Sequence, residues 1–72
     1  MTQNIRINGE PEPLDAATLA DLLTARGIVP PGGVPRGVAV AVNGMVVPAA
    51  RWADHRLGPG DEIEIVRPFQ GG

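Results

Sequence analysis

Apolar and polar residues alternate in two segments of the chain, one near its beginning and one near its end. Ile5 and Ile7 alternate with polar residues over Asn4–Asn8, and a similar pattern recurs over Glu62–Val66. Successive side chains of a strand point to opposite faces of a sheet, so a period of two indicates a strand with one face in the core. Both segments are therefore predicted to be half-buried strands.

Two Asn-Gly pairs predict tight turns between strands. Asn8-Gly9 follows the first alternating segment, and Asn43-Gly44 follows the apolar run Val38–Val42. Both residues of such a pair tolerate positive φ, as a two-residue type I′ turn requires. The chain is therefore expected to return in two further strands, Glu10–Leu14 and Met45–Val47, which complete two hairpins.

Prolines and apolar runs indicate where these strands belong in a sheet. Pro11 and Pro13 cannot donate ladder hydrogen bonds, so the first return strand is expected at an edge. Val38–Val42 is apolar at every position, which in so short a run predicts a central strand covered in part on both faces. Pro48 is expected to end the second return strand.

One helix is predicted between the hairpins, from about Thr18 to Arg26. Leu19, Leu22 and Leu23 follow the i, i+3, i+4 spacing of one helix face. The threonine at the start has an acidic residue three positions later, which resembles a capping pair. Gly27 suits the left-handed position after a helix end, where a basic residue in the last turn would face the helix dipole. The helix therefore offers one narrow apolar stripe to a sheet.

The remaining segments are predicted to be loops and short turns. Val29–Gly37 holds three prolines and three glycines, so it is expected to be an exposed and mobile loop. Ala49–Ala53 is expected to form one helical turn that packs Trp52 inward. Gly58–Asp61 reads as the tight turn that leads into the final strand.

These elements follow the order hairpin, helix, hairpin, final strand, and a chain of 72 residues holds only one core. A mixed sheet of four to five strands packed on the single helix buries the apolar faces in two layers, which is an α+β architecture. The predicted core consists of Ile5, Ile7, Leu14, Leu19, Leu22, Leu23, Val38, Val40, Val42, Trp52, Leu57, Ile63 and Ile65.

Composition narrows the chemistry that this domain can perform. The chain has no cysteine and a single histidine, so disulfides, thiolate zinc sites and cysteine nucleophiles are excluded. His55 has no carboxylate, serine or metal-ligand companion at a telling spacing and is interpreted as a surface or capping residue. Asp61 is expected to cap its turn and not to bind magnesium. No metal site is predicted.

Charge and the beginning of the chain point to a protein partner. A formal net charge of −2 gives no basic surface for nucleic acid or for anionic lipid. The first residues contain neither a secretory signal pattern nor an apolar run that could span a bilayer. The expected compartment is therefore the cytoplasm, and the expected partners include neither nucleic acid nor membrane.

The chain ends in a segment that cannot continue the sheet. Pro68 cannot donate to a ladder, and Gly71-Gly72 has no side chain to pack. Residues 1–68 are therefore predicted to form the domain, and residues 69–72 a flexible tail. A terminal Gly-Gly alone is a weak signal in a chain with ten glycines.

Nearly the whole chain resembles the ubiquitin-like β-grasp sulfur carriers, most closely those of the thiamine pathway. The resemblance implies the β-grasp fold for the architecture predicted above. The features that carry it are Ile5-Arg6-Ile7-Asn8-Gly9, Ala41-Val42-Asn43-Gly44, Val47-Pro48 followed by Arg51-Trp52, Leu57 with Gly60-Asp61, and the Gly71-Gly72 end.

The resemblance implies that the chain is a sulfur carrier of thiazole formation and a co-substrate, not an enzyme. An E1-like adenylyltransferase of the ThiF type would use ATP to join AMP to the carboxylate of Gly72. A sulfur donor would then convert this end to a thiocarboxylate, which gives its sulfur to a ThiG-type thiazole synthase. Gly71 would let the tail thread narrow clefts of both enzymes. The chain itself would bind no cofactor, and the free protein is expected to be a monomer.

Partner contacts are expected near the final strand and the tail. The candidates are Phe69 and Gln70 in the tail, with Arg67, Glu62 and Glu64 supplying charge complementarity. Two other assignments remain open on the sequence. One is the molybdopterin-pathway type of sulfur carrier, which shares the tail chemistry. The other is a β-grasp interaction module whose Gly-Gly end is incidental.

Overall fold

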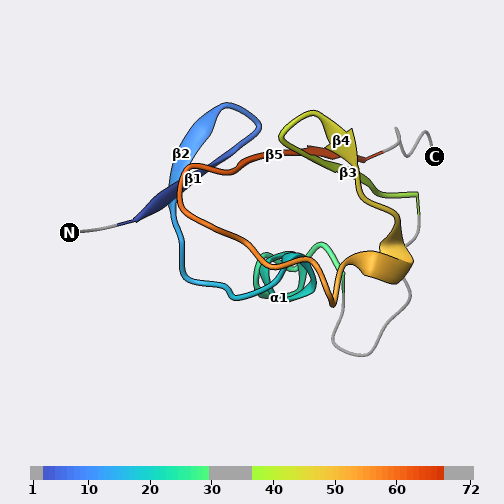
Figure 1. Cartoon of the computed structure of the whole chain (residues 1–72). Coiled ribbons are helices and arrows are strands. Elements are labelled where there is room, and N and C mark those ends of the chain that lie inside the picture. Colours follow the sequence, from blue (N-terminus) through green and yellow to red (C-terminus); the bar gives the residue numbers. More distant parts are fainter. Residues whose placement is uncertain (1–2, 30–36, 68–72) are drawn as a thin grey trace.

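The computed structural model describes residues 3–29 and 37–67, which form one mixed sheet and one main helix (Figure 1). The sheet has five strands in the order β2-β1-β5-β3-β4, and the helix α1 packs against one of its faces. This is the expected α+β architecture. The elements are β1 (Asn4–Ile7), β2 (Glu10–Pro13), α1 (Leu19–Ala25), β3 (Ala39–Val42), β4 (Met45–Val46), the 3-10 turn η1 (Ala49–Arg51) and β5 (Glu62–Val66).

The last strand, β5, occupies the middle of the sheet. It pairs in parallel with β1 and antiparallel with β3, while both hairpins are antiparallel. As expected, Val38–Val42 supplies an inner strand, since β3 is flanked by β5 and β4, while the middle position of the sheet belongs to β5. Val40 is buried and Ala39 is exposed, because α1 covers only one face of the sheet. As expected, β2 lies at an edge.

The hairpin turns have the backbone that the Asn-Gly pairs predict. Asn8 and Gly9 have φ angles of 51° and 84°, and Asn43 and Gly44 have angles of 52° and 84°. Asparagine tolerates this left-handed region better than most residues, and glycine adopts it without strain. Both turns therefore fix the register of their hairpins with no extra residue.

Helix α1 begins and ends close to the predicted residues. The hydroxyl oxygen of Thr18 accepts a hydrogen bond from the backbone N–H of Asp21 at 3.1 Å, which confirms the capping pair. Gly27 follows the C-cap with a φ of 75°. Arg26 is the C-cap residue, so the last turn holds no basic side chain, and its guanidinium pairs with Glu12 of β2 at 3.3 Å.

The core lies between α1 and the inner face of the sheet. Most of the predicted core is buried, but Leu14, Val38, Leu57 and Ile65 are only half-buried at its margin. The buried apolar residues are Ile5, Ile7, Leu19, Leu22, Leu23, Val29, Val40, Val42, Val47, Trp52 and Ile63.

Two buried valines were not predicted to be core residues. Val29 was expected in an exposed loop, but it is only 8% exposed and its N–H donates to the carbonyl of Leu23. Val47 follows β4, and its carbonyl accepts a hydrogen bond of 2.8 Å from the indole N–H of Trp52. Each valine is followed by a proline, which interrupts the apolar period from which its burial could have been predicted. Residues 30–36 of the same predicted loop lie outside the described residues.

Candidate functional site

The predicted partner-binding residues of β5 lie on the face of the sheet that α1 leaves open. Glu62 and Glu64 are exposed, and Arg67 is exposed directly after the strand. Strand alternation places the glutamates on the face opposite the buried Ile63. The tail candidates Phe69, Gln70, Gly71 and Gly72 lie outside the described residues.

The open face of the sheet has a charged half and an apolar half. Strand register extends the face from β5 to its neighbours on both sides. We call it the outward face. Its charged half consists of Arg6, Glu62 and Glu64, and its apolar half of Ala39, Ala41, Val46 and Val66.

The charged half is solvated. Arg6 lies opposite Glu62 in the register, yet its guanidinium donates to the carbonyl of Gly9 at 3.1 Å. In the part of the chain that the structure describes, the ion pair is the one between Arg26 and Glu12, which involves none of these three residues. The glutamates of the outward face are therefore free to meet a basic partner surface.

The apolar half lies beside the end of β5 from which the chain continues to its last residues. Val66 is 61% exposed and pairs with Ala39, while Val46 is 74% exposed and pairs with Ala41. The two alanines leave the surface between the valines low and accessible. Exposed apolar groups beside a chain end suit a docking surface that positions that end in a partner. The sequence analysis did not predict this apolar surface, although Val66 occupies the third outward position of the alternating strand.

Two asparagine side chains hold β5 in the plane of the sheet. Asn8 accepts from the N–H of Ile65 at 2.8 Å and donates to the carbonyl of the same residue at 3.3 Å. Asn43 accepts from the N–H of Glu62 at 2.9 Å and donates to a carboxylate oxygen of Asp61 at 3.1 Å. The same residues that make the turns therefore brace both ends of the strand that precedes the tail.

Asp61 caps its turn as predicted. One carboxylate oxygen accepts from the N–H of Gly58 at 2.8 Å, while the other accepts from Asn43. Gly60 has a φ of 85°, which the turn requires. Within residues 3–29 and 37–67, no group of three histidine or acidic side chains is placed to hold a metal ion. None of the helices described there is long and apolar enough to span a membrane.

Comparison with known proteins places these features in one family. The ThiS family model matches residues 2–72. The sulfur carrier protein ThiS of Thermus thermophilus is 36% identical over 66 residues, which covers 92% of this chain and 95% of that protein. The crystal structure of the thiamine biosynthesis protein ThiS of Geobacter metallireducens superposes with a TM-score of 0.72 at 26% identity, covering 96% of this chain and 99% of that one.

These matches confirm the expected β-grasp fold and the expectation of a carrier protein instead of an enzyme. Both named relatives are ThiS proteins, so the matches favour the thiamine-pathway type of carrier and not the molybdopterin type. With a family model over nearly the whole chain, a relative above one third identity and a shared fold, the chain belongs to the ThiS family.

Proposed function

We propose that this chain carries sulfur for thiamine biosynthesis on the carboxylate of Gly72. The observation that carries the proposal is the exposed outward face of β5, which continues into the Gly-Gly end of a ThiS-family chain. The chain contributes the reacting atom and a docking surface, and its enzyme partners contribute the catalytic groups. The reactions take place in the cytoplasm.

The chemistry begins with activation of a poor electrophile. A carboxylate oxygen of Gly72 attacks the α-phosphorus of ATP on an E1-like enzyme, which forms an acyl-adenylate and releases pyrophosphate. A sulfur donor then displaces AMP and leaves a thiocarboxylate. This sulfur is a strong nucleophile at neutral pH, and a thiazole synthase accepts it. ATP belongs to the adenylating enzyme, and the carrier holds no cofactor of its own.

The described residues support this role by offering two kinds of contact. Val66 and its apolar neighbours are at least partly exposed and supply apolar area that a partner can bury, and Glu62 and Glu64 supply charge. Arg67 lies between this surface and the tail, in which Phe69 and Gln70 add contacts. Gly71 and Gly72 lack a Cβ, so the tail can pass close to a partner backbone.

The test is pyrophosphate release by a ThiF-type enzyme with ATP, followed by intact mass of the product. The parent chain is expected to form the adenylate and, once sulfide is added as the sulfur donor, to exchange one carboxylate oxygen of Gly72 for sulfur. Removing Gly72, or adding one residue, shifts the carbonyl by about 3.3–3.6 Å and should abolish release. Thr24→Ala, on the exposed side of α1, is the matched control and should react as the parent does. Release that continues without Gly72 would contradict the proposal.

A second assay separates the two types of carrier. The thiocarboxylate form should support thiazole formation with thiazole synthase and should fail to convert the molybdopterin precursor with that pathway's synthase. The opposite result would assign the chain to the molybdopterin pathway. Failure of both with an intact adenylation step would leave a carrier for a different acceptor and would overturn the thiamine assignment.

A further inference from the structure

Both hairpin turns consist of an Asn-Gly pair, which can undergo a spontaneous reaction with itself and with water. The backbone nitrogen of the glycine attacks Cγ of the asparagine, and no Cβ on the glycine obstructs the approach. A bond forms between this nitrogen and Cγ, the bond between Cγ and Nδ2 breaks, and ammonia leaves. Water then opens the cyclic imide at either of its carbonyls, which gives aspartate or isoaspartate. The chain holds two such pairs, Asn8-Gly9 and Asn43-Gly44.

The two turns are closely matched in their local structure. The asparagines have φ angles of 51° and 52°, and both glycines have angles of 84°. Each pair follows a β-branched residue, Ile7 in the first turn and Val42 in the second. Both glycines are exposed, and among the described residues neither glycine N–H donates to a backbone carbonyl. The attacking nitrogen is therefore equally accessible in both turns, and a difference in rate comes from the surroundings of the asparagine side chains.

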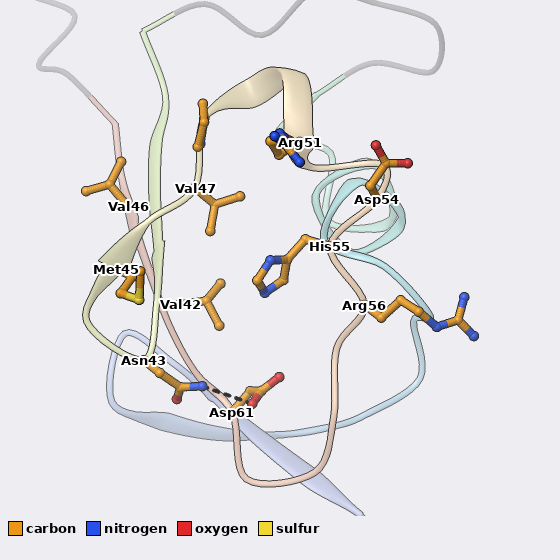
Figure 2. Close-up of a pocket in the computed structure, with 11 residues that line it drawn as sticks. Val42, Asn43, Met45, Val46, Val47, Arg51, Asp54, His55, Arg56 and Asp61 are labelled. Atoms are coloured by element: carbon orange, nitrogen blue, oxygen red, sulfur yellow. Dashed lines mark hydrogen bonds between the residues drawn. The ribbon is translucent and has the colours of Figure 1, made fainter.

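The hydrogen bonds that hold the two asparagine side chains differ in strength. Each side chain must release these bonds before Cγ can turn toward the glycine nitrogen. The amide of Asn8 donates to the carbonyl of Ile65 at 3.3 Å, which is long for such a bond. The amide of Asn43 donates to a carboxylate oxygen of Asp61 at 3.1 Å, and Figure 2 shows the two side chains directed at each other. A hydrogen bond to an ionised acceptor is roughly twice as strong as one between neutral groups, so Asn8 is released more easily.

The charges beside the two turns have opposite signs. As the glycine nitrogen loses its proton and attacks, negative charge develops on the side-chain oxygen of the asparagine. At the first turn, the guanidinium of Arg6 donates to the carbonyl of Gly9 at 3.1 Å, so a positive charge lies close to the reacting groups. At the second turn, the carboxylate of Asp61 contacts the reacting amide itself. The positive charge stabilises the developing anion, and the carboxylate destabilises it.

We propose that Asn8 is a site of spontaneous deamidation and that it reacts before Asn43, although the two turns have the same backbone. Aspartate at this position keeps an oxygen for the N–H of Ile65 but has no donor for its carbonyl. Isoaspartate adds one atom to the backbone of a two-residue turn, whose length sets the register of the hairpin. Either product loosens the end of β5 from which the chain continues to its last residues. The inference does not depend on whether Gly72 carries sulfur.

The test is incubation of the full chain at mildly alkaline pH, with intact mass to count the exchanges of ammonia for water and peptide mapping to locate them. Asn8 should react at least about threefold faster than Asn43. Capped peptides that span residues 7–10 and 42–45 lack β5 and serve as the reference. The two peptides should react within about twofold of each other, and each at least about tenfold faster than the same pair in the protein.

Four results would overturn the proposal. One is a reaction at Asn43 that is as fast as the reaction at Asn8, or faster. Another is an Asn8 that reacts as fast as its peptide, because β5 would then not restrain it. A third is no exchange at Asn8 over a time about a thousandfold longer than its peptide needs. The last is a pair of peptides with the same preference as the protein, which would place the cause in the local sequence.

Variants of the neighbouring charges test the cause of the preference. Arg6→Gln removes the positive charge and should slow Asn8 at least about twofold, while Arg6→Lys keeps a charge there and should react nearly as the parent does. Asp61→Asn leaves one oxygen for two donors and should speed Asn43 at least about threefold without changing Asn8. Asp21→Asn, at an exposed position in the first turn of α1, is the matched control and should change neither rate.

The electrostatic argument is wrong if Arg6→Gln leaves the rate at Asn8 unchanged. It is also wrong if Asp61→Asn slows Asn43, because the carboxylate would then act as a base in the reaction. Circular dichroism checks that each variant folds. If Asp61→Asn does not fold, the comparison of Arg6→Gln with Arg6→Lys decides.

Amide hydrogen exchange measures the structural consequence. In protein whose Asn8 has become isoaspartate, the amide of Ile65 should exchange at least about threefold faster than in the parent. The amide of Glu62, which Asn43 holds, should not change. Asn8→Asp keeps the length of the turn and should show a smaller change at Ile65. Unchanged exchange at Ile65 in the isoaspartate form would show that the first turn does not hold this end of β5, and would overturn the proposed consequence.

Discussion

The inner and the outward face of the sheet come from alternate residues of the same strands, yet they differ sharply in exposure. On the inner face, Ile5, Val40 and Ile63 are each 1% exposed against α1. On the outward face, Val46 and Val66 are 74% and 61% exposed. The inner face supplies the stability of a small domain, whereas the outward face keeps apolar groups in water. Such a cost is understandable where a partner covers them.

The largest expected effect breaks the inner face. Leu23 is completely buried, so Leu23→Ala should reduce the free energy of unfolding by about 2–5 kcal/mol. A core of this size supplies only about 3–5 kcal/mol, so much of the protein should be unfolded at 25 °C. Urea denaturation measures the change. Leu23→Met keeps most of the volume and should cost less than about 1.5 kcal/mol. An alanine variant that denatures as the parent does would show that the helix contributes little.

The next effect separates the faces. Val66→Arg places a charge on the apolar half of the outward face, where the side chain has room. The free energy of unfolding should change by less than about 0.5 kcal/mol, while KM for the adenylating enzyme should rise about tenfold or more. Thr24→Arg adds the same charge on the exposed side of α1 and should leave KM unchanged. An equal effect of both variants would mean that net charge, not this surface, governs docking.

A smaller effect concerns groups that belong to neither face, since Asn8 and Asn43 bond within the plane of the sheet. Asn8→Asp loses one donor to the carbonyl of Ile65 and should cost about 0.5–1.5 kcal/mol. Asn43→Asp also places a carboxylate beside that of Asp61, so it should cost more. Thermal unfolding of the two variants at neutral pH measures the difference. A larger loss of stability for Asn8→Asp than for Asn43→Asp would show that the first hairpin, whose asparagine bonds to Ile65 near the end of β5, carries more of the stability.

The smallest effect lies at the surface between β2 and α1. Arg26 and Glu12 form a partly exposed ion pair, with side chains 37% and 32% exposed. A double-mutant cycle with Arg26→Gln and Glu12→Gln should give a coupling of about 0.2–1 kcal/mol that shrinks as salt is added. A coupling that is insensitive to salt would mean that the pair is held apart from water.

Local patterns in the sequence predicted most of the fold. The alternation of Asn4–Asn8 and Glu62–Val66, the leucine stripe and the two Asn-Gly turns each depend on neighbouring residues, and each is found in the structure. The place of β5 in the middle of the sheet depends on pairing between distant segments, which no local pattern encodes. Val29 and Val47 were missed for a related reason, since a single apolar residue beside proline has no period to reveal its burial.

The candidate site was predictable in its charged part only. Glu62 and Glu64 stand out because they alternate with isoleucines in one strand. The apolar half was not, because Ala39 and Val46 join Val66 only through the register of three strands. The bracing role of Asn8 was hidden as well, since its turn function already explained the residue.

The position of β5 also has a consequence during synthesis of the protein. The side chain of Asn8 bonds to Ile65, 57 positions later, and β1 finds its parallel partner only in β5. A nascent chain on the ribosome can only sample α1 and each hairpin, which are marginal alone, and the sheet cannot close until the last strand emerges. Interrupted products that lack β5 expose their isoleucines to chaperones and proteases. Such products are therefore expected to remain unfolded.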